Sequence, residues 1–164
     1  DALQANGRIY MVDSTVSGAG DTILGTLFCE RCTIKSRSVM MWPRNHENVH
    51  GNVFINSTFI GTQQPTTIAR SPRNERFTYP FAEVVLLNAT LINVAPEGWG
   101  DADKQGNVRF WEFESKNPDG TLVDVSRRVQ WSRQLQKVKD AKLIADYSRP
   151  EVVLSGWKPR LSHE

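Results

Sequence analysis

Short apolar stretches of alternating character recur along the chain up to residue 93. Four segments align without gaps: IYMVDSTVSG (9–18), LFCERCTIKS (27–36), NVFINSTFIG (52–61) and VVLLNATLIN (84–93). Their β-branched and aromatic residues, with period-two alternation, predict strands. Polar residues interrupt these segments, as at Asn56 and Ser57, and this interruption predicts a bend between two short strands.

Each of these segments also carries a small residue followed by threonine and an apolar residue, as in Ser57-Thr58-Phe59. The intervals between the triplets are unequal and grow along the chain, which favours coils joined by loops of variable length. One such unit cannot bury its apolar face alone, whereas stacked units bury a continuous column. We therefore expect an all-β fold, a right-handed parallel β-helix in which like residues stack. A β-sandwich with coincidental similarity is the alternative.

The pattern changes after residue 95. NVRFWEFES (107–115) predicts another strand, and NPDG (117–120) predicts a turn. Residues 124–147 have helical spacing and predict an amphipathic helix that covers the side of the column. The residues expected on one side of this helix are Val129, Leu135, Val138 and Leu143, and either Asp124 or Ser126 could cap it. We expect a single domain, with coils over 1–115 and the C-terminal helix and tail over 116–164.

Length and composition suit one globular domain. The chain has 164 residues, 39% apolar and 23% charged, and twenty Lys and Arg against eighteen Asp and Glu give a net charge of +2. This balance does not argue for nucleic acid as a partner. The sequence has no run of eighteen apolar residues, so no membrane span is expected, and no secretory leader is visible in it.

The two cysteines form the motif CERC, Cys29 to Cys32. Such a pair serves either as a redox couple or as half of a zinc site. The three histidines are not at ligand spacing from it, and the flanking residues predict strands rather than the helix that opens after a redox pair. We therefore expect two buried structural thiols. The sequons at Asn56 and Asn88 fall at the same repeat position, which favours a recurring bend residue over glycosylation.

Four motifs, in order, resemble the C-terminal portion of the pectin methylesterase family. The chain opens on DALQANGR, similar to the family's Gln-Asp-Thr-Leu segment cut after the glutamine, and DTILG (21–25) resembles its Asp-Phe-Ile-Phe-Gly. APEGW (95–99) matches its Pro-Glu-Gly-Trp, and RRVQWSRQL (127–135) matches its Arg-Val-x-Trp-Ser-Arg. This resemblance covers nearly the whole chain. It implies a carbohydrate esterase on a right-handed parallel β-helix.

The resemblance also implies the roles of individual residues. Asp21 would be the nucleophile, Asp1 the general acid and then base, and Arg70 the arginine that orients Asp21 and keeps it ionised. A methyl ester needs an attacking oxygen and a proton donor for the departing methoxide, and these residue types supply both. The chemistry requires no metal or other cofactor.

Two further residues fall at substrate-binding positions of the family, Trp99 and Leu24. Leu24 stands where the family has a second aromatic residue, and Pro72 stands where it has a tryptophan, so both aromatic platforms are replaced. The loop SPRNERFTYPFAE (71–83) could supply substitutes through Phe77, Tyr79 and Phe81.

Each assignment has a structural alternative. Asp21 could simply form a turn, and Arg70 could be a solvated surface arginine. Trp99 could fill a gap in the core instead of stacking on a sugar ring. The chain alone leaves these alternatives open.

By the same resemblance, the expected substrate is pectin, a methyl-esterified polygalacturonate, and the expected location is secreted or periplasmic. The family's oxyanion-forming glutamines would lie before Asp1. We therefore expect an upstream portion of the same protein to complete the β-helix, since a column that begins at its middle exposes an unpaired strand edge.

Four other functions compete with the esterase. RSPRNER (70–76) comes near a pectate lyase signature, but Glu75 stands where the second arginine belongs, and the carboxylate cluster that binds calcium is not evident. The neighbouring aspartates of a polygalacturonase are not evident either. A non-catalytic carbohydrate-binding β-helix and a relative that hydrolyses another ester or thioester remain as alternatives.

Overall fold

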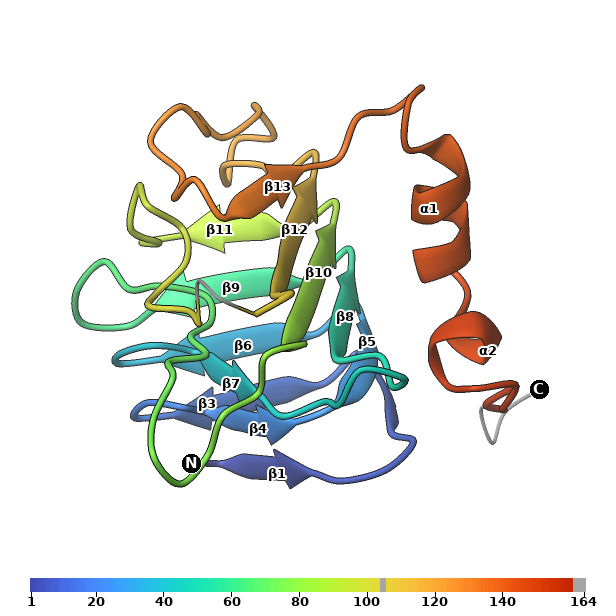
Figure 1. Cartoon of the computed structure of the whole chain (residues 1–164). Coiled ribbons are helices and arrows are strands. Elements are labelled where there is room, and N and C mark those ends of the chain that lie inside the picture. The colour runs from blue at the N-terminus through green and yellow to red at the C-terminus, as the bar shows by residue number, and fades with distance from the viewer. Residues whose placement is uncertain (104–105, 161–164) are drawn as a thin grey trace.

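The computed structural model describes residues 1–103 and 106–160, and it is built from stacked coils (Figure 1). Sheet A contains β1 (Leu3–Ala5), β4 (Ile23–Gly25) and β7 (Met41–Pro43). Sheet B contains β2 (Tyr10–Val12), β5 (Leu27–Glu30), β8 (Asn52–Ile55), β10 (Glu83–Leu87), β12 (Arg109–Phe113) and β13 (Ser132–Gln134). Sheet C contains β3 (Thr15–Gly18), β6 (Thr33–Ser36), β9 (Thr58–Gly61) and β11 (Thr90–Ile92).

The named strands pair in parallel with their counterparts on the next coil. In sheet B, Cys29 of β5 pairs with Phe54 of β8, and Phe54 pairs with Leu86 of β10. Stacking of this kind confirms the parallel β-helix and rules out the sandwich, whose sheets are antiparallel. The aligned segments thus stack at equivalent positions, as the sequence repeat predicts.

Each aligned segment contributes one strand to sheet B and one to sheet C, with a bend between them. The bend residues have positive φ in all four segments: Asp13 (48°), Arg31 (50°), Asn56 (50°) and Asn88 (55°). Their N–H groups donate to carbonyl oxygens on the next coil, as from Asn56 to Leu87 at 2.9 Å. Asparagine tolerates this left-handed conformation better than most residues, which gives the two sequon asparagines a structural role as bend residues.

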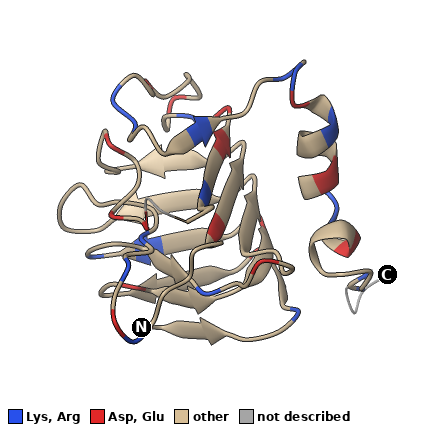
Figure 2. Ribbon diagram, viewed as in Figure 1, with Lys and Arg blue, Asp and Glu red and all other residues tan. Residues whose placement is uncertain are grey.

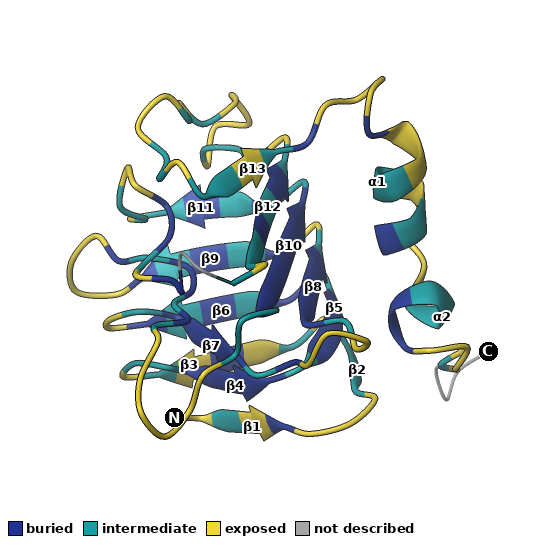
Figure 3. Cartoon of the chain, viewed as in Figure 1, coloured by how far each residue is buried: buried dark blue, intermediate teal, exposed yellow. Residues whose placement is uncertain are grey.

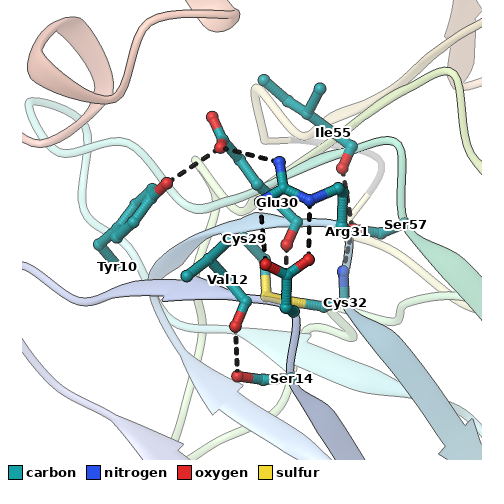
Figure 4. Close-up of a disulfide and its surroundings, with 10 residues drawn as sticks. Tyr10, Val12, Ser14, Cys29, Glu30, Arg31, Cys32, Ile55 and Ser57 are labelled. Carbon is teal, nitrogen blue, oxygen red and sulfur yellow. Dashed lines mark hydrogen bonds and ion pairs between the residues drawn. A yellow bond between two sulfur atoms is a disulfide. The ribbon is translucent and has the colours of Figure 1, made fainter. Parts of the chain in front are cut away.

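The cysteine prediction is right about burial and wrong about the free thiols. Cys29 and Cys32 are 0% and 1% exposed and form a disulfide (Figure 4). Cys29 points inward from β5, and the positive φ of Arg31 turns the chain so that Cys32 points inward as well. The sequence pattern predicted both positions, but it did not show that the bend brings the two sulfurs within bonding distance.

The column interior is filled by large apolar side chains stacked from coil to coil. Phe54 and Phe59 meet edge to face at 5.0 Å between ring centroids, and Trp99 stacks on Phe110 at 5.0 Å. All four are no more than 1% exposed (Figure 3 shows the buried strands). Burial of this continuous apolar column is the main term that stabilises stacked repeats.

The predicted helix over 124–147 is wrong for most of its length. Only α1 (Ala141–Tyr147) and the short α2 (Pro150–Val153) are helical, and Val138 is 90% exposed. Residues 132–134 instead form β13, so sheet B continues past residue 115, where the coils were expected to end. Periodicity failed here because hydrogen bonds to the preceding coil decide the conformation.

A buried carboxylate anchors this segment to the column. Glu112 of β12 is 0% exposed and accepts hydrogen bonds from Arg128 Nε at 2.6 Å and Gln134 Nε2 at 2.7 Å. Ser115 Oγ donates to it at 2.6 Å. A charge removed from water is stable only when it is paired and hydrogen-bonded, so the partners of Glu112 must fold with it.

The two C-terminal helices lie along the outer face of sheet B (Figure 1), which confirms a helix packed on the side of the column. Apolar side chains of α1, of α2 and of Leu154, which follows α2, pack against outward-facing residues of sheet B. The buried members are Phe28, Val53, Val85, Leu87, Leu135, Tyr147, Val153 and Leu154.

A second buried carboxylate lies under α1. Glu83 of β10 is 0% exposed, and Tyr147 donates a hydrogen bond to its Oε2 at 2.5 Å. Its other partners are Arg109 Nε on Oε2 at 2.8 Å and His50 Nδ1 on Oε1 at 2.9 Å. The acidic start of β10 beside the basic start of β12 is visible in Figure 2. Burial acts to raise the pKa of Glu83, but the hydrogen bond with His50, the charge of Arg109 and the Tyr147 hydroxyl outweigh it and hold that pKa below its ordinary 4.5.

The positive φ of the bends leads to a first prediction. Replacement Asn56→Val should lower the free energy of unfolding by about 1–2 kcal/mol, because a β-branched residue is strained at positive φ. Asn56→Gly should stay close to the native value. Urea denaturation measures both. Thr58→Val, two residues on in β9, is the control and should be tolerated; an equal loss there, or none in Asn56→Val, would contradict the assignment.

The Glu83 cluster leads to a second prediction. Tyr147→Phe should lower the free energy of unfolding by about 1–3 kcal/mol at neutral pH, because a buried carboxylate loses a donor. The pKa of Glu83 is lower in the folded state, so its contribution is present above pH 4.5 and is lost as the pH falls through the folded pKa. The difference between variant and native protein should therefore shrink in acid. Tyr79→Phe is the matched control in urea melts, and a pH-independent deficit would count against the cluster.

Candidate active site

Asp21 and Arg70, 49 residues apart in sequence, form a two-bond pair on the outer side of sheet A. Arg70 Nε donates to Asp21 Oδ1 at 2.9 Å, and Arg70 Nη2 donates to Oδ2 at 2.6 Å. The side chains are 18% exposed for Asp21 and 36% exposed for Arg70. Both charged groups are therefore partly shielded from water yet open to a ligand on this face.

The coil geometry brings the two residues together. Asp21 lies just before β4, and Arg70 follows Ala69, which bridges to Met41 of β7. β4 and β7 pair in parallel, so segments from three coils stand side by side. Asp21 itself has a positive φ of 40°, and its N–H donates to Val39 O at 2.8 Å. A bend thus holds the carboxylate, as the turn-forming alternative also required.

The neighbours of Asp21 fix this bend. Thr22 Oγ1 and Ser36 Oγ share a buried hydrogen bond at 2.8 Å. A Cβ at position 20 would come too close to Ser38 Oγ, so the next coil packs closely against the chain just before Asp21.

The guanidinium of Arg70 is held by more than its carboxylate. Its hydrogen bonds to Asp21 raise the pKa of Arg70, against the effect of burial, so it stays charged. Its Cζ also lies 4.8 Å from the ring centroid of Trp42. Such a cation over an indole ring is attracted by the electron-rich face, and the contact limits how far Arg70 can swing.

Trp42 was not identified from the sequence. It is 9% exposed in β7, and Phe77 and Tyr79 approach it edge to face at 6.5 and 6.3 Å. Two of the loop aromatics that could replace the lost platforms therefore gather beside the Asp21–Arg70 pair. No strand was predicted over residues 41–43, so the sequence pattern did not indicate that this ring lies on the outer face.

Asp1 lies on the coil next to Asp21. Its backbone nitrogen donates to Gly20 O at 3.2 Å, and the N–H groups of Ala2 and Leu3 both donate to Thr22 O. The side chain of Asp1 is exposed. The structure thus brings Asp1 to the neighbourhood of Asp21.

The two expected substrate-binding residues do not reach the surface. Trp99 is 1% exposed and stacks on Phe110, so it fills the core and offers no face to a sugar ring. Leu24 is 4% exposed in β4 and also lies out of reach. The resemblance implied substrate contacts for both residues but gave no information about the burial that neighbouring coils impose.

Among the residues that the structure describes, no group of three or more His, Cys, Asp or Glu side chains is arranged to hold a metal ion. Within the same residues, no helix has the length and apolarity to cross a membrane.

A parallel β-helix with a carboxylate and an arginine joined across its coils is the architecture that the sequence motifs predicted for a carbohydrate esterase. No family model matches the chain. The chain is 28% identical over 140 residues to Pectinesterase 31 of Arabidopsis thaliana. That alignment covers 79% of this chain and 42% of the relative. Putative pectinesterase 11 of the same plant is 28% identical over 148 residues, 81% of this chain and 38% of that protein. Probable pectinesterase 29, also of Arabidopsis thaliana, is 26% identical over 146 residues, which are 80% of this chain and 42% of that protein.

These relatives support a pectinesterase family relationship for the chain, as its motifs predicted. The chain spans about two fifths of the length of the curated relatives it matches.

The Asp21–Arg70 geometry leads to a third prediction. A double-mutant cycle with Asp21→Asn and Arg70→Met should give a coupling free energy of about 1–2 kcal/mol in urea denaturation, because the pair is two-bonded and partly buried. The matched control is Asp13–Arg31, whose carboxylate and guanidinium are also joined by two bonds but lie 64% and 52% exposed. Its coupling should be smaller, since solvent screens it. An equal coupling free energy in the two cycles would contradict the conclusion that the Asp21–Arg70 pair is shielded from solvent.

Proposed function

We propose that this chain carries the reacting carboxylate of a carboxylic ester hydrolase that removes methyl groups from esterified polygalacturonate. The observation that carries the proposal is the two-bonded Asp21–Arg70 pair on the open face of sheet A. Arg70 directs both oxygens of Asp21 and keeps a positive charge beside them. The names of the relatives support the same activity.

In the proposed reaction, an Asp21 oxygen attacks the ester carbonyl carbon of a uronate residue. The bond from that carbon to the methoxy oxygen breaks, and Asp1, initially protonated, gives its proton to the departing methoxide, which leaves as methanol. The product is an acyl anhydride between the sugar carboxyl and Asp21. Water then attacks the acyl carbon of the sugar and gives one proton to Asp1, while the bond from that carbon to the Asp21 oxygen breaks. The sugar leaves as a carboxylic acid that loses its proton to solvent, and both aspartates are restored.

Arg70 has two tasks in this scheme. Its Nε and Nη2 groups, which donate to the two Asp21 oxygens, fix the direction of these oxygens before attack. This reduces the entropic cost of reaching the reactive geometry. Its guanidinium also places a positive charge beside both oxygens of Asp21. The indole ring of Trp42 packs against the Arg70 guanidinium and limits its movement, so Trp42 acts as a positioning residue.

The proposal includes an upstream portion of the same protein and an extracellular or periplasmic location. Within the described residues, β1 and β2 lie at the ends of sheets A and B, and their outer edges are suited to pair with further coils. The Cys29–Cys32 disulfide supports an oxidising compartment.

The test is methanol release from methyl-esterified polygalacturonate by the full-length gene product. Asp21→Asn should reduce the rate by more than about 10³-fold, because the amide is a poor nucleophile. Asp13→Asn is the matched control: its native residue also has positive φ and also forms a two-bonded pair with arginine. It should leave the rate unchanged.

The outcome that rejects the proposal is methanol release by Asp21→Asn at the native rate. An unsaturated product in place of methanol would assign the protein to the lyases. A folded native protein that binds the polymer without releasing methanol would assign it to the non-catalytic binding modules.

A further inference from the structure

A cavity of about 540 Å³ opens where the first coils turn from sheet A into sheet B. Its wall includes the turn after β1, the turn between β4 and β5, and the loop after β7. The ionisable side chains that line it are Arg8, Arg44, His46 and His50. No aspartate or glutamate is among the described residues that line it, so the cavity carries only basic groups.

Arg44 is held by two aromatic rings. Its Cζ lies 4.7 Å from the ring centroid of Trp42 and 5.7 Å from that of Phe77. Its Nε is buried and has no hydrogen-bond partner, and none of the described carboxylates forms an ion pair with it. A guanidinium that is shielded by rings and lacks an anion is a preformed donor group for a carboxylate, which can accept two parallel hydrogen bonds from it.

The loop that carries Arg44 is fixed from behind. Asn45 is 2% exposed, and its Nδ2 donates to Phe81 O at 2.8 Å and to Val49 O at 3.1 Å. Its Oδ1 accepts from the Glu83 N–H at 2.8 Å. These bonds tie the loop to β10, so the cavity wall does not have to be ordered when a ligand binds, which lowers the cost of binding.

One indole ring connects this cavity to the Asp21–Arg70 pair. Trp42 lies against the guanidinium of Arg70 and against that of Arg44, at 4.8 and 4.7 Å from its ring centroid. A sugar chain that contacts Trp42 would therefore have both guanidinium groups beside it.

We propose that Arg44 binds the free carboxylate of an acidic sugar unit that neighbours the unit whose ester meets Asp21. This inference rests on the proposed function for the identity of the polymer. Arg44 would make the protein select partly demethylated stretches, because an ester in place of the carboxylate loses the charge-assisted hydrogen bonds. Arg8, which lines the same cavity, adds to the field that attracts the polyanion.

The experiment titrates an unmethylated oligogalacturonate into the native protein and its variants by isothermal calorimetry. Arg44→Gln should weaken binding by about tenfold, the size expected for a charged hydrogen-bonded contact. Arg44→Lys keeps the charge but not the fork and should recover part of the affinity. Lys137→Gln, which removes one exposed charge outside the cavity, should bind like the native protein. A neutral oligomer of galactose of the same length should bind weakly to all of them.

Two results would overturn the inference: native affinity in Arg44→Gln, or binding of the neutral oligomer as tight as that of the acidic one. Urea melts of Arg44→Gln confirm that the variant is folded, and a purely structural role of Arg44 would lower stability without changing the preference for the acidic oligomer. That pattern would also reject the inference.

Methanol release, measured on the same proteins, separates the two proposals. Native release together with unchanged binding in Arg44→Gln rejects the Arg44 subsite and leaves the esterase. Charge-dependent binding through Arg44 without any release of methanol rejects the esterase and leaves a subsite for an acidic saccharide.

Discussion

Parallel, in-register stacking of coils is the constraint on which the rest of the structure depends. Each coil is held to the next by strand hydrogen bonds, and the left-handed bend residues, such as Asn56, keep the phase of sheets B and C constant from coil to coil. Because register is fixed, side chains at equivalent positions form columns through the interior. The same constraint places Asp21 and Arg70 in hydrogen-bond contact across coils, although 49 residues separate them.

The two buried glutamates show how the column binds its C-terminal segment. Glu112 is paired with Arg128 and Gln134 and draws β13 into sheet B. Glu83 is paired with Tyr147 and fixes α1 on the outer face of that sheet. A buried carboxylate without partners is strongly destabilising, so these contacts restrict where the segment can pack, while the apolar contacts beside them supply most of the favourable free energy.

On the face of sheet A, one tryptophan ring contacts two arginines, of which one is paired with a carboxylate and the other is not. Arg70 is satisfied by a carboxylate, and Arg44 is not, although both guanidinium groups lie against Trp42. The first arrangement directs an acidic oxygen, and the second attracts one from outside. The difference arises from the neighbouring coils: Asp21 lies within reach of Arg70, whereas the cavity beside Arg44 is lined by basic side chains.

The sequence by itself determined the repeat, the bends and the order of the coils, because these follow from local alternation and from residues that tolerate positive φ. It also determined Asp21 and Arg70 as candidates through their motifs. Only the tertiary structure decided that Trp99 is buried, that Cys29 and Cys32 are joined, and that residues 132–134 form a strand. Trp42 and Arg44 likewise gained their roles only there. Each of these features depends on which side chains of the adjacent coil lie beside it. Local sequence spacing carries no information about the distance between residues on different coils.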